Sequence, residues 1–170
     1  MGLVAVVQHD LGLIAVAAKD YPRARTHLEE SLRLARENGL DDYEAGVLGS
    51  LGYLELEEGN LERADSALKE GLRHALDLGV VDGSTAHDLY TLAVVTMLRG
   101  EPAPACVLVG ACDAAFDLVG MAREPNAESA RRETLRQAEA TMGQDAMGRA
   151  CARGSALTVV EAVEYALSLD

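Results

Sequence analysis

The chain has 170 residues, a length that predicts one domain, and 49% of its residues are hydrophobic against 25% charged, which excludes an intrinsically disordered chain. Its formal net charge of −13 excludes a surface for direct nucleic-acid binding, because such surfaces need clustered Lys and Arg side chains to neutralise phosphates. The cysteines Cys106, Cys112 and Cys151 form no CxxC pair and indicate a reducing compartment, so we expect a cytoplasmic protein.

The first predicted helix covers residues 2–18 and is apolar almost throughout. Residues 8–10 interrupt the apolar run and no basic segment precedes it, so the pattern predicts neither a signal peptide nor a membrane span. The pattern of this helix recurs further along the chain, as in proteins built of stacked helical repeats. The helix at the end of such an array normally has a polar outer face, which this helix lacks. We therefore expect Leu3, Val7 and Ile14 to pack against a preceding repeat of a longer protein or, in the isolated chain, against a second copy, giving a homodimer.

The helices that follow repeat the pattern of the first ones at an offset of 40 residues. Gly12 aligns with Gly52, each after a Leu, and each would cost about 1 kcal/mol in a helix interior unless close helix contact required it. A third copy lies 41 residues further on. The predicted helices of these copies are 2–18, 22–38, 42–58, 61–78, 85–99 and 103–119. Their period predicts helix-pair repeats at about residues 5–40, 45–80 and 86–120.

The last third of the chain departs from the repeat. Helices are predicted at 126–142, 144–152 and 158–168. Thr158 followed by Glu161 predicts a capping box, in which each residue satisfies a free backbone N–H at the start of a helix. Because the last apolar face of an array needs a cover, we expect residues 125–170 to form a helical cap.

The spacing of Leu-Gly, Ala, a large apolar residue and a small residue resembles the tetratricopeptide repeat (TPR) family. The family's signature Trp and closing Pro are missing, and the period exceeds the usual length of about 34 residues. The resemblance implies an all-α fold: a right-handed TPR-like α-solenoid of antiparallel helix pairs with a C-terminal capping helix, forming a single domain over residues 1–170. It also implies a role in binding a protein or peptide partner.

Residues 85–169 resemble, in order and spacing, the C-terminal end of the STAND class of signal-transduction ATPases, which includes the large LuxR-type transcriptional regulators. The resemblance rests on the helix around Gly110-Ala111, the linker at Pro125, the charged helix after it and the segment Gly154–Ala162. It implies that the chain is the sensor or regulatory TPR region of such a regulator. No P-loop or helix-turn-helix signature appears, so we expect neither ATPase nor DNA-binding parts here.

No residue pattern indicates catalysis or a metal site. The histidines, which form no HExxH motif and no i, i+4 pair, are His9, His27, His74 and His87. The acidic run Glu55, Glu57 and Glu58 is typical of a solvated helix end, and Arg131 and Arg132 of a solvated helix face. We therefore expect no enzyme, no cofactor and no metal.

The TPR resemblance places a partner-binding stripe on the first helix of each pair, where helical spacing aligns the side chains on one face. The stripe is apolar with Tyr and His at its edges, which suits an amphipathic helix or an apolar peptide. The candidate partner-binding residues are His9, Leu13, Val16, Tyr53, Leu56, Glu57, His87, Tyr90, Val94 and Met97. The alternative is that these stripes are core, covered by neighbouring repeats.

Three functions remain open from the sequence. The first is the regulatory scaffold of a STAND-type transcriptional regulator. The second is a stand-alone TPR adaptor that bridges other proteins. The third is a receptor that holds a small ligand or peptide in the groove.

Overall fold

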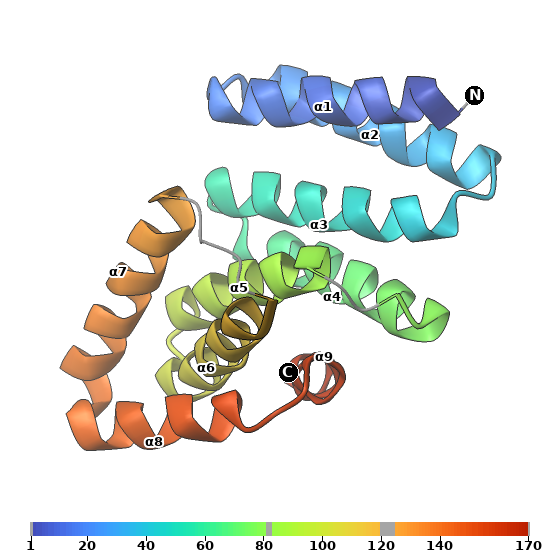
Figure 1. Cartoon of the computed structure of the whole chain (residues 1–170). Coiled ribbons are helices and arrows are strands. Elements are labelled where there is room, and N and C mark those ends of the chain that lie inside the picture. Colours follow the sequence, from blue (N-terminus) through green and yellow to red (C-terminus); the bar gives the residue numbers. More distant parts are fainter. Residues whose placement is uncertain (1, 81–82, 120–124, 170) are drawn as a thin grey trace. The chain divides into compact units, whose positions relative to one another are not determined.

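The computed structural model describes residues 2–80, 83–119 and 125–169 of the chain (Figure 1). The described residues form nine helices and no strand, which confirms the predicted all-α fold. None of these helices has the length and apolar character needed to cross a membrane. The helices are α1 (Gly2–Ala17), α2 (Tyr21–Glu37), α3 (Asp41–Glu57), α4 (Leu61–Leu78), α5 (Gly83–Leu98), α6 (Pro102–Val119), α7 (Pro125–Met142), α8 (Gln144–Ser155) and α9 (Val159–Leu167).

The helices divide into two compact units, residues 1–80 with α1 to α4 and residues 81–170 with α5 to α9. The boundary falls between the second and third predicted repeats. The expectation of a single domain stays a prediction.

Local signals set the helix ends. Thr158 Oγ1 accepts a hydrogen bond from the Glu161 N–H at 3.2 Å, and the Glu161 carboxylate accepts one from the Thr158 N–H at 2.8 Å, so the predicted capping box is present at the start of α9. Asp20 caps α2 by accepting from the Arg23 N–H at 3.3 Å. Gly79 ends α4 in the left-handed region at a φ of 71°, which glycine adopts without a steric cost.

The first unit consists of two helix pairs, α1 with α2 and α3 with α4, and the glycines of the predicted repeat lie inside them. A Cβ built on Gly12 would stand 2.6 Å from Leu28 Cγ, and one built on Gly52 would stand 2.5 Å from Leu68 Cγ. The two contacts are the same contact moved by 40 residues. Each glycine makes room for a fully buried Leu of the partner helix.

The two pairs of the first unit share a core. Figure 1 shows α3 running beside α1, with α2 behind α1. The core side chains come from α1, α2 and α3, so α3 of the second pair packs against one side of the first pair. They are Ala15, Val16, Ala24, Leu28, Val47, Leu51 and Leu54.

The second unit is built around α6, which contacts α5, α7, α8 and α9. Gly110 and Gly154 allow α6 and α8 to meet backbone to backbone, since a Cβ on Gly154 would lie 1.9 Å from the Val107 carbonyl oxygen. Helix α9 buries Ala162 and Val163 and packs on α5 and α6. It therefore covers part of α5 and α6, and the helical cap over residues 125–170 stays a prediction.

Helix α7 is held to α6 by an ion pair that the sequence did not suggest. The Arg131 guanidinium donates to both carboxylate oxygens of Asp113, from Nε at 2.8 Å to Oδ1 and from Nη2 at 2.6 Å to Oδ2. The prediction of a solvated face was wrong for half-buried Arg131. Arg132 does lie on the exposed side, where it pairs with Glu128.

Candidate partner-binding surface

The ten candidate residues are distributed over both units. In the first unit the residues lie on α1 and α3: His9, Leu13, Val16, Tyr53, Leu56 and Glu57. In the second they lie on α5: His87, Tyr90, Val94 and Met97.

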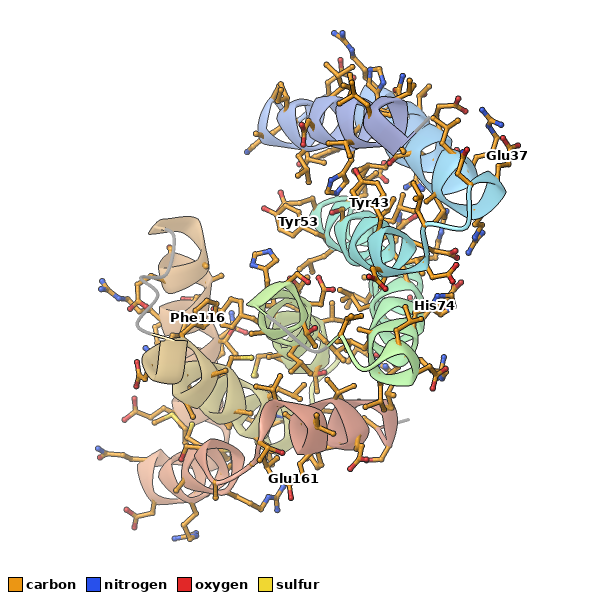
Figure 2. All side chains as sticks on the ribbon, turned by 45° about the vertical axis from the view of Figure 1, so that its right-hand side comes forward. Glu37, Tyr43, Tyr53, His74, Phe116 and Glu161 are labelled. Atoms are coloured by element: carbon orange, nitrogen blue, oxygen red, sulfur yellow. The ribbon has the colours of Figure 1, made fainter. Side chains whose placement is uncertain are left out.

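A polar cluster joins α1 to α3 at the centre of the first unit's stripe. His9 Nε2 lies 2.7 Å from Ser50 Oγ, within hydrogen-bonding distance, and the His9 ring stands edge-on to the Tyr43 ring, with ring centroids 5.6 Å apart. The Tyr43 hydroxyl donates to the Ala5 carbonyl at 3.3 Å, and Ser31 Oγ donates to the same carbonyl at 2.8 Å. Figure 2 labels Tyr43 and Tyr53 on α3. These contacts hold α1 and α3, the first helices of the two pairs, in one register.

Burial sets the charge of this cluster. It lowers the pKa of His9, although the nearby Asp10 carboxylate acts in the opposite direction. The His9 imidazole is therefore neutral at pH 7, and one of its ring nitrogens can serve as donor or acceptor towards Ser50. The centre of the α1–α3 surface thus carries no positive charge.

Exposed apolar side chains flank the cluster. Leu13 and Val6 on α1 are each 39% exposed, while Tyr53 and Leu56 on α3 are half-buried. Val16 is 5% exposed and belongs to the core. The part of the stripe that reaches solvent therefore lies towards Val6 and Leu13.

An acidic side chain borders the α3 part of this surface. Glu57 at the end of α3 is exposed and accepts a hydrogen bond from the Tyr21 hydroxyl at 3.4 Å. Its carboxylate therefore adds a negative charge at the edge of the stripe.

Two of the four stripe residues on α5 belong to the core. Tyr90 and Met97 are 6% and 8% exposed, and the Tyr90 hydroxyl donates to the Ala127 carbonyl of α7 at 2.9 Å. Burial raises the pKa of Tyr90, so it stays protonated. His87 is exposed and Val94 is half-buried. Tyr90 and Met97, like Val16, stabilise the protein from inside, as the alternative interpretation of the stripes expected.

Sequence patterns did not identify Tyr43 and Ser50 as site residues, and they predicted the wrong environment for Glu55. Glu55 was expected to be solvated but is only 4% exposed. Its carboxylate accepts from Arg25 Nη1 at 2.6 Å and from Asn60 Nδ2 at 2.9 Å. Burial raises the pKa of Glu55, but these hydrogen bonds outweigh it and the pKa is lowered on balance. The repeat aligns Glu55 with Ala15, and the structure buries both positions.

One group of possible metal ligands occurs among the described residues. Oxygen and nitrogen atoms of Glu44, Glu70 and His74 lie within 4.8 Å of one another. Arg36 already pairs with both carboxylates, through Nε to Glu44 at 2.7 Å and through Nη2 to Glu70 at 3.1 Å. The guanidinium supplies the positive charge that a cation would bring, so this group is an ion-pair network between α2, α3 and α4.

A shallow hollow of about 500 Å³ lies between α1 and α2, outside the predicted stripe. The side chains that line it are polar or charged: Gln8, Thr26, His27, Glu29, Glu30 and Arg33. Gln8 Oε1 lies 2.6 Å from His27 Nδ1 across it. This hollow differs from the apolar pocket that the ligand-receptor hypothesis expects.

Residues 3–77 match the family model of the tetratricopeptide repeat. The matched segment contains both helix pairs of the first unit, whose repeated Gly–Leu contacts the structure shows. Such repeats generally mediate binding between proteins. No curated protein and no solved structure matches the chain.

Proposed function

We propose that the chain is a protein-binding scaffold whose first unit holds a partner segment on the α1–α3 surface. The observation that carries this proposal is the exposure of Val6 and Leu13 beside a polar cluster that keeps α1 and α3 in one register. A surface that is ordered before binding loses less conformational entropy when a partner binds.

The chemistry of the surface indicates the kind of partner. Apolar side chains at helical spacing suit one face of an amphipathic helix. Asp10 and Glu57 are exposed at the margins, and the chain carries a net charge of −13. The partner helix is therefore expected to combine an apolar stripe with basic flanks, because complementary charge speeds association and excludes acidic competitors.

We further propose that this scaffold is the sensor or regulatory region of a STAND-type transcriptional regulator. The resemblance that suggests it lies in residues 85–169, and three of its matching positions have clear structural roles. Gly154 allows the close contact of α8 with α6, and Thr158 and Glu161 form the capping box of α9. An ATPase domain encoded in the same polypeptide would support this assignment. A gene that encodes only this chain would favour the stand-alone adaptor.

Selection from a displayed library of random helical peptides tests the scaffold proposal. The selected peptides should bind the wild-type chain and lose at least about tenfold in affinity for Leu13→Glu, because a charge would replace an apolar contact worth about 1.4 kcal/mol or more. Val160→Glu is the matched control, since Val160 is an exposed apolar residue of α9 in the second unit. Peptides that bind Leu13→Glu as tightly as the wild type would refute the proposed surface.

A further inference from the structure

The outer face of α1 is apolar and exposed. Among the described residues, nine large apolar side chains are exposed, and six of them belong to this single helix. The six are Leu3, Val4, Val6, Val7, Leu13 and Ile14. Leu3 and Ile14 are exposed by 77% and 65%. Apolar surface gathered in this way is typical of a contact site.

The second helix pair shows what this face is built to contact. At the offset of 40 residues, Val7 and Ile14 of α1 correspond to Val47 and Leu54 of α3. Val47 and Leu54 are fully buried against residues of α1 and α2. The same face of the repeat is therefore covered in α3 and bare in α1.

A helix that packs on this face of α1 must differ in charge from α2, which packs on the same face of α3. On α3 the contact with α2 includes two carboxylates, with Glu44 paired to Arg36 and Glu55 paired to Arg25. The corresponding positions of α1 are Val4 and Ala15. A helix like α2 would lose both of these ion pairs on α1, and its two arginines would be partly desolvated without them. The α1 face thus matches an apolar helix that carries no charge at the contact.

Helix α1 is itself such a helix. Asp10 is its one Asp, Glu, Lys or Arg residue. In a two-fold symmetric contact each residue meets the same surface of the other copy, so like charges on the face would repel. With a net charge of −13, the chain can approach a second copy most favourably through this nearly uncharged helix.

We propose that the α1 face formed by Leu3, Val4, Val7 and Ile14 docks on the same face of a second copy of this chain. The contact leaves the proposed partner-binding surface accessible, because Leu13 lies about a third of a turn around the helix from Val7. The proposal is independent of the function proposed above.

Light scattering coupled to gel filtration tests the proposal on the full chain, loaded at about 50 µM so that a dimer of micromolar dissociation constant is populated. The wild type should have a mass close to twice 18.0 kDa. The double variant Val7→Glu/Ile14→Glu should have half the wild-type mass, and Val160→Glu should remain dimeric. Raising the salt from about 0.05 M to about 0.5 M should not weaken the dimer, because an apolar contact contains no ion pair to screen.

Two results would overturn the proposal. A monomeric wild type would show that the face is left for another protein or for a preceding repeat. A dimer that survives the double substitution would show that the copies meet elsewhere. Both substituted side chains are exposed in the single chain, so circular dichroism should report unchanged helix content. The milder variant Val7→Ser/Ile14→Ser should also shift the equilibrium towards monomer.

Discussion

The two units differ in how closely helix backbones approach at their glycines. In the first unit, Gly12 and Gly52 each face the side chain of a Leu, which fills the space left by the missing Cβ, and a Cβ built on Gly71 would stand 2.9 Å from the Ala45 carbonyl oxygen. In the second unit, Gly110 and Gly154 face main-chain atoms of the opposite helix. A side chain can shift by a rotamer or a few tenths of an ångström, whereas helix backbone moves only with the whole helix. The first unit should therefore tolerate an added methyl group at Gly12 or Gly52 better than the α6–α8 contact tolerates one at Gly154.

The largest effect is expected for Gly154→Ala. The added methyl group would stand 1.9 Å from the Val107 carbonyl oxygen, so α8 must move away from α6. We expect the free energy of unfolding to fall by about 3 kcal/mol or more, at the upper end of the range for overpacked cores. Urea denaturation would measure the loss, and hydrogen exchange should place it in α6 and α8 while α1 and α2 keep their protection.

Gly148→Ala is the matched control on the same helix. No atom lies within 4 Å of a Cβ at Gly148, so the helix should gain up to about 1 kcal/mol from the better helix-forming residue. Equal stability of the two alanine variants would show that α6 and α8 do not meet backbone to backbone.

A smaller loss is expected for Gly52→Ala in the first unit. The new methyl group would stand 2.5 Å from Cγ of the fully buried Leu68, so that side chain must shift within a filled core. The cost of overpacking should exceed the gain in helix propensity. We therefore expect the free energy of unfolding to fall by about 1–2 kcal/mol, measured by thermal or urea denaturation. Gly46→Ala on the same helix meets no atom within 4 Å and should be neutral or stabilising. A larger loss for Gly52→Ala than for Gly154→Ala would reverse the comparison of the two units.

The smallest effect, a gain in stability, is expected for Lys19→Gly. Lys19 stands in the left-handed region at a φ of 59°, and its counterpart in the second repeat is Gly59 at 79°. The conformation costs a residue with a side chain about 1–2 kcal/mol, and part of this is offset by the greater freedom of glycine in the unfolded chain. A net gain of about 0.5–1 kcal/mol should appear in the urea midpoint.

Lys19→Ala separates backbone strain from the loss of the lysine side chain. It keeps the strained conformation, so it should leave the stability close to that of the wild type. Equal stabilities for the Gly and Ala variants would mean that the turn after α1 is not strained.

The fold could be predicted from the sequence because its signals are local or periodic. The offset that aligns Gly12 with Gly52, and the Thr158–Glu161 capping box, depend on residues a fixed distance apart. Helix ends predicted from such signals lie within a few residues of those observed.

The candidate surface could be predicted only in part. Helical spacing places Leu13 and Val16 on one stripe of α1, but it does not say that α2 and α3 cover Val16 and leave Leu13 exposed. Tyr90 was missed as a core residue for a similar reason, since its hydrogen bond reaches Ala127 of α7, 37 residues away. Contacts between distant segments decide which side of an apolar stripe meets solvent, and spacing alone carries no information about them.

Hydrogen exchange of the full chain with and without a selected helical peptide locates the bound partner on one unit or the other. If the partner binds the α1–α3 surface, exchange should slow in α1 and α3 on binding and stay unchanged in α7 and α9. Leu13→Glu should weaken this protection when the peptide is held close to its wild-type dissociation constant. Protection confined to α7, α8 or α9, with α1 and α3 unchanged, would contradict a partner-binding surface on the repeat unit.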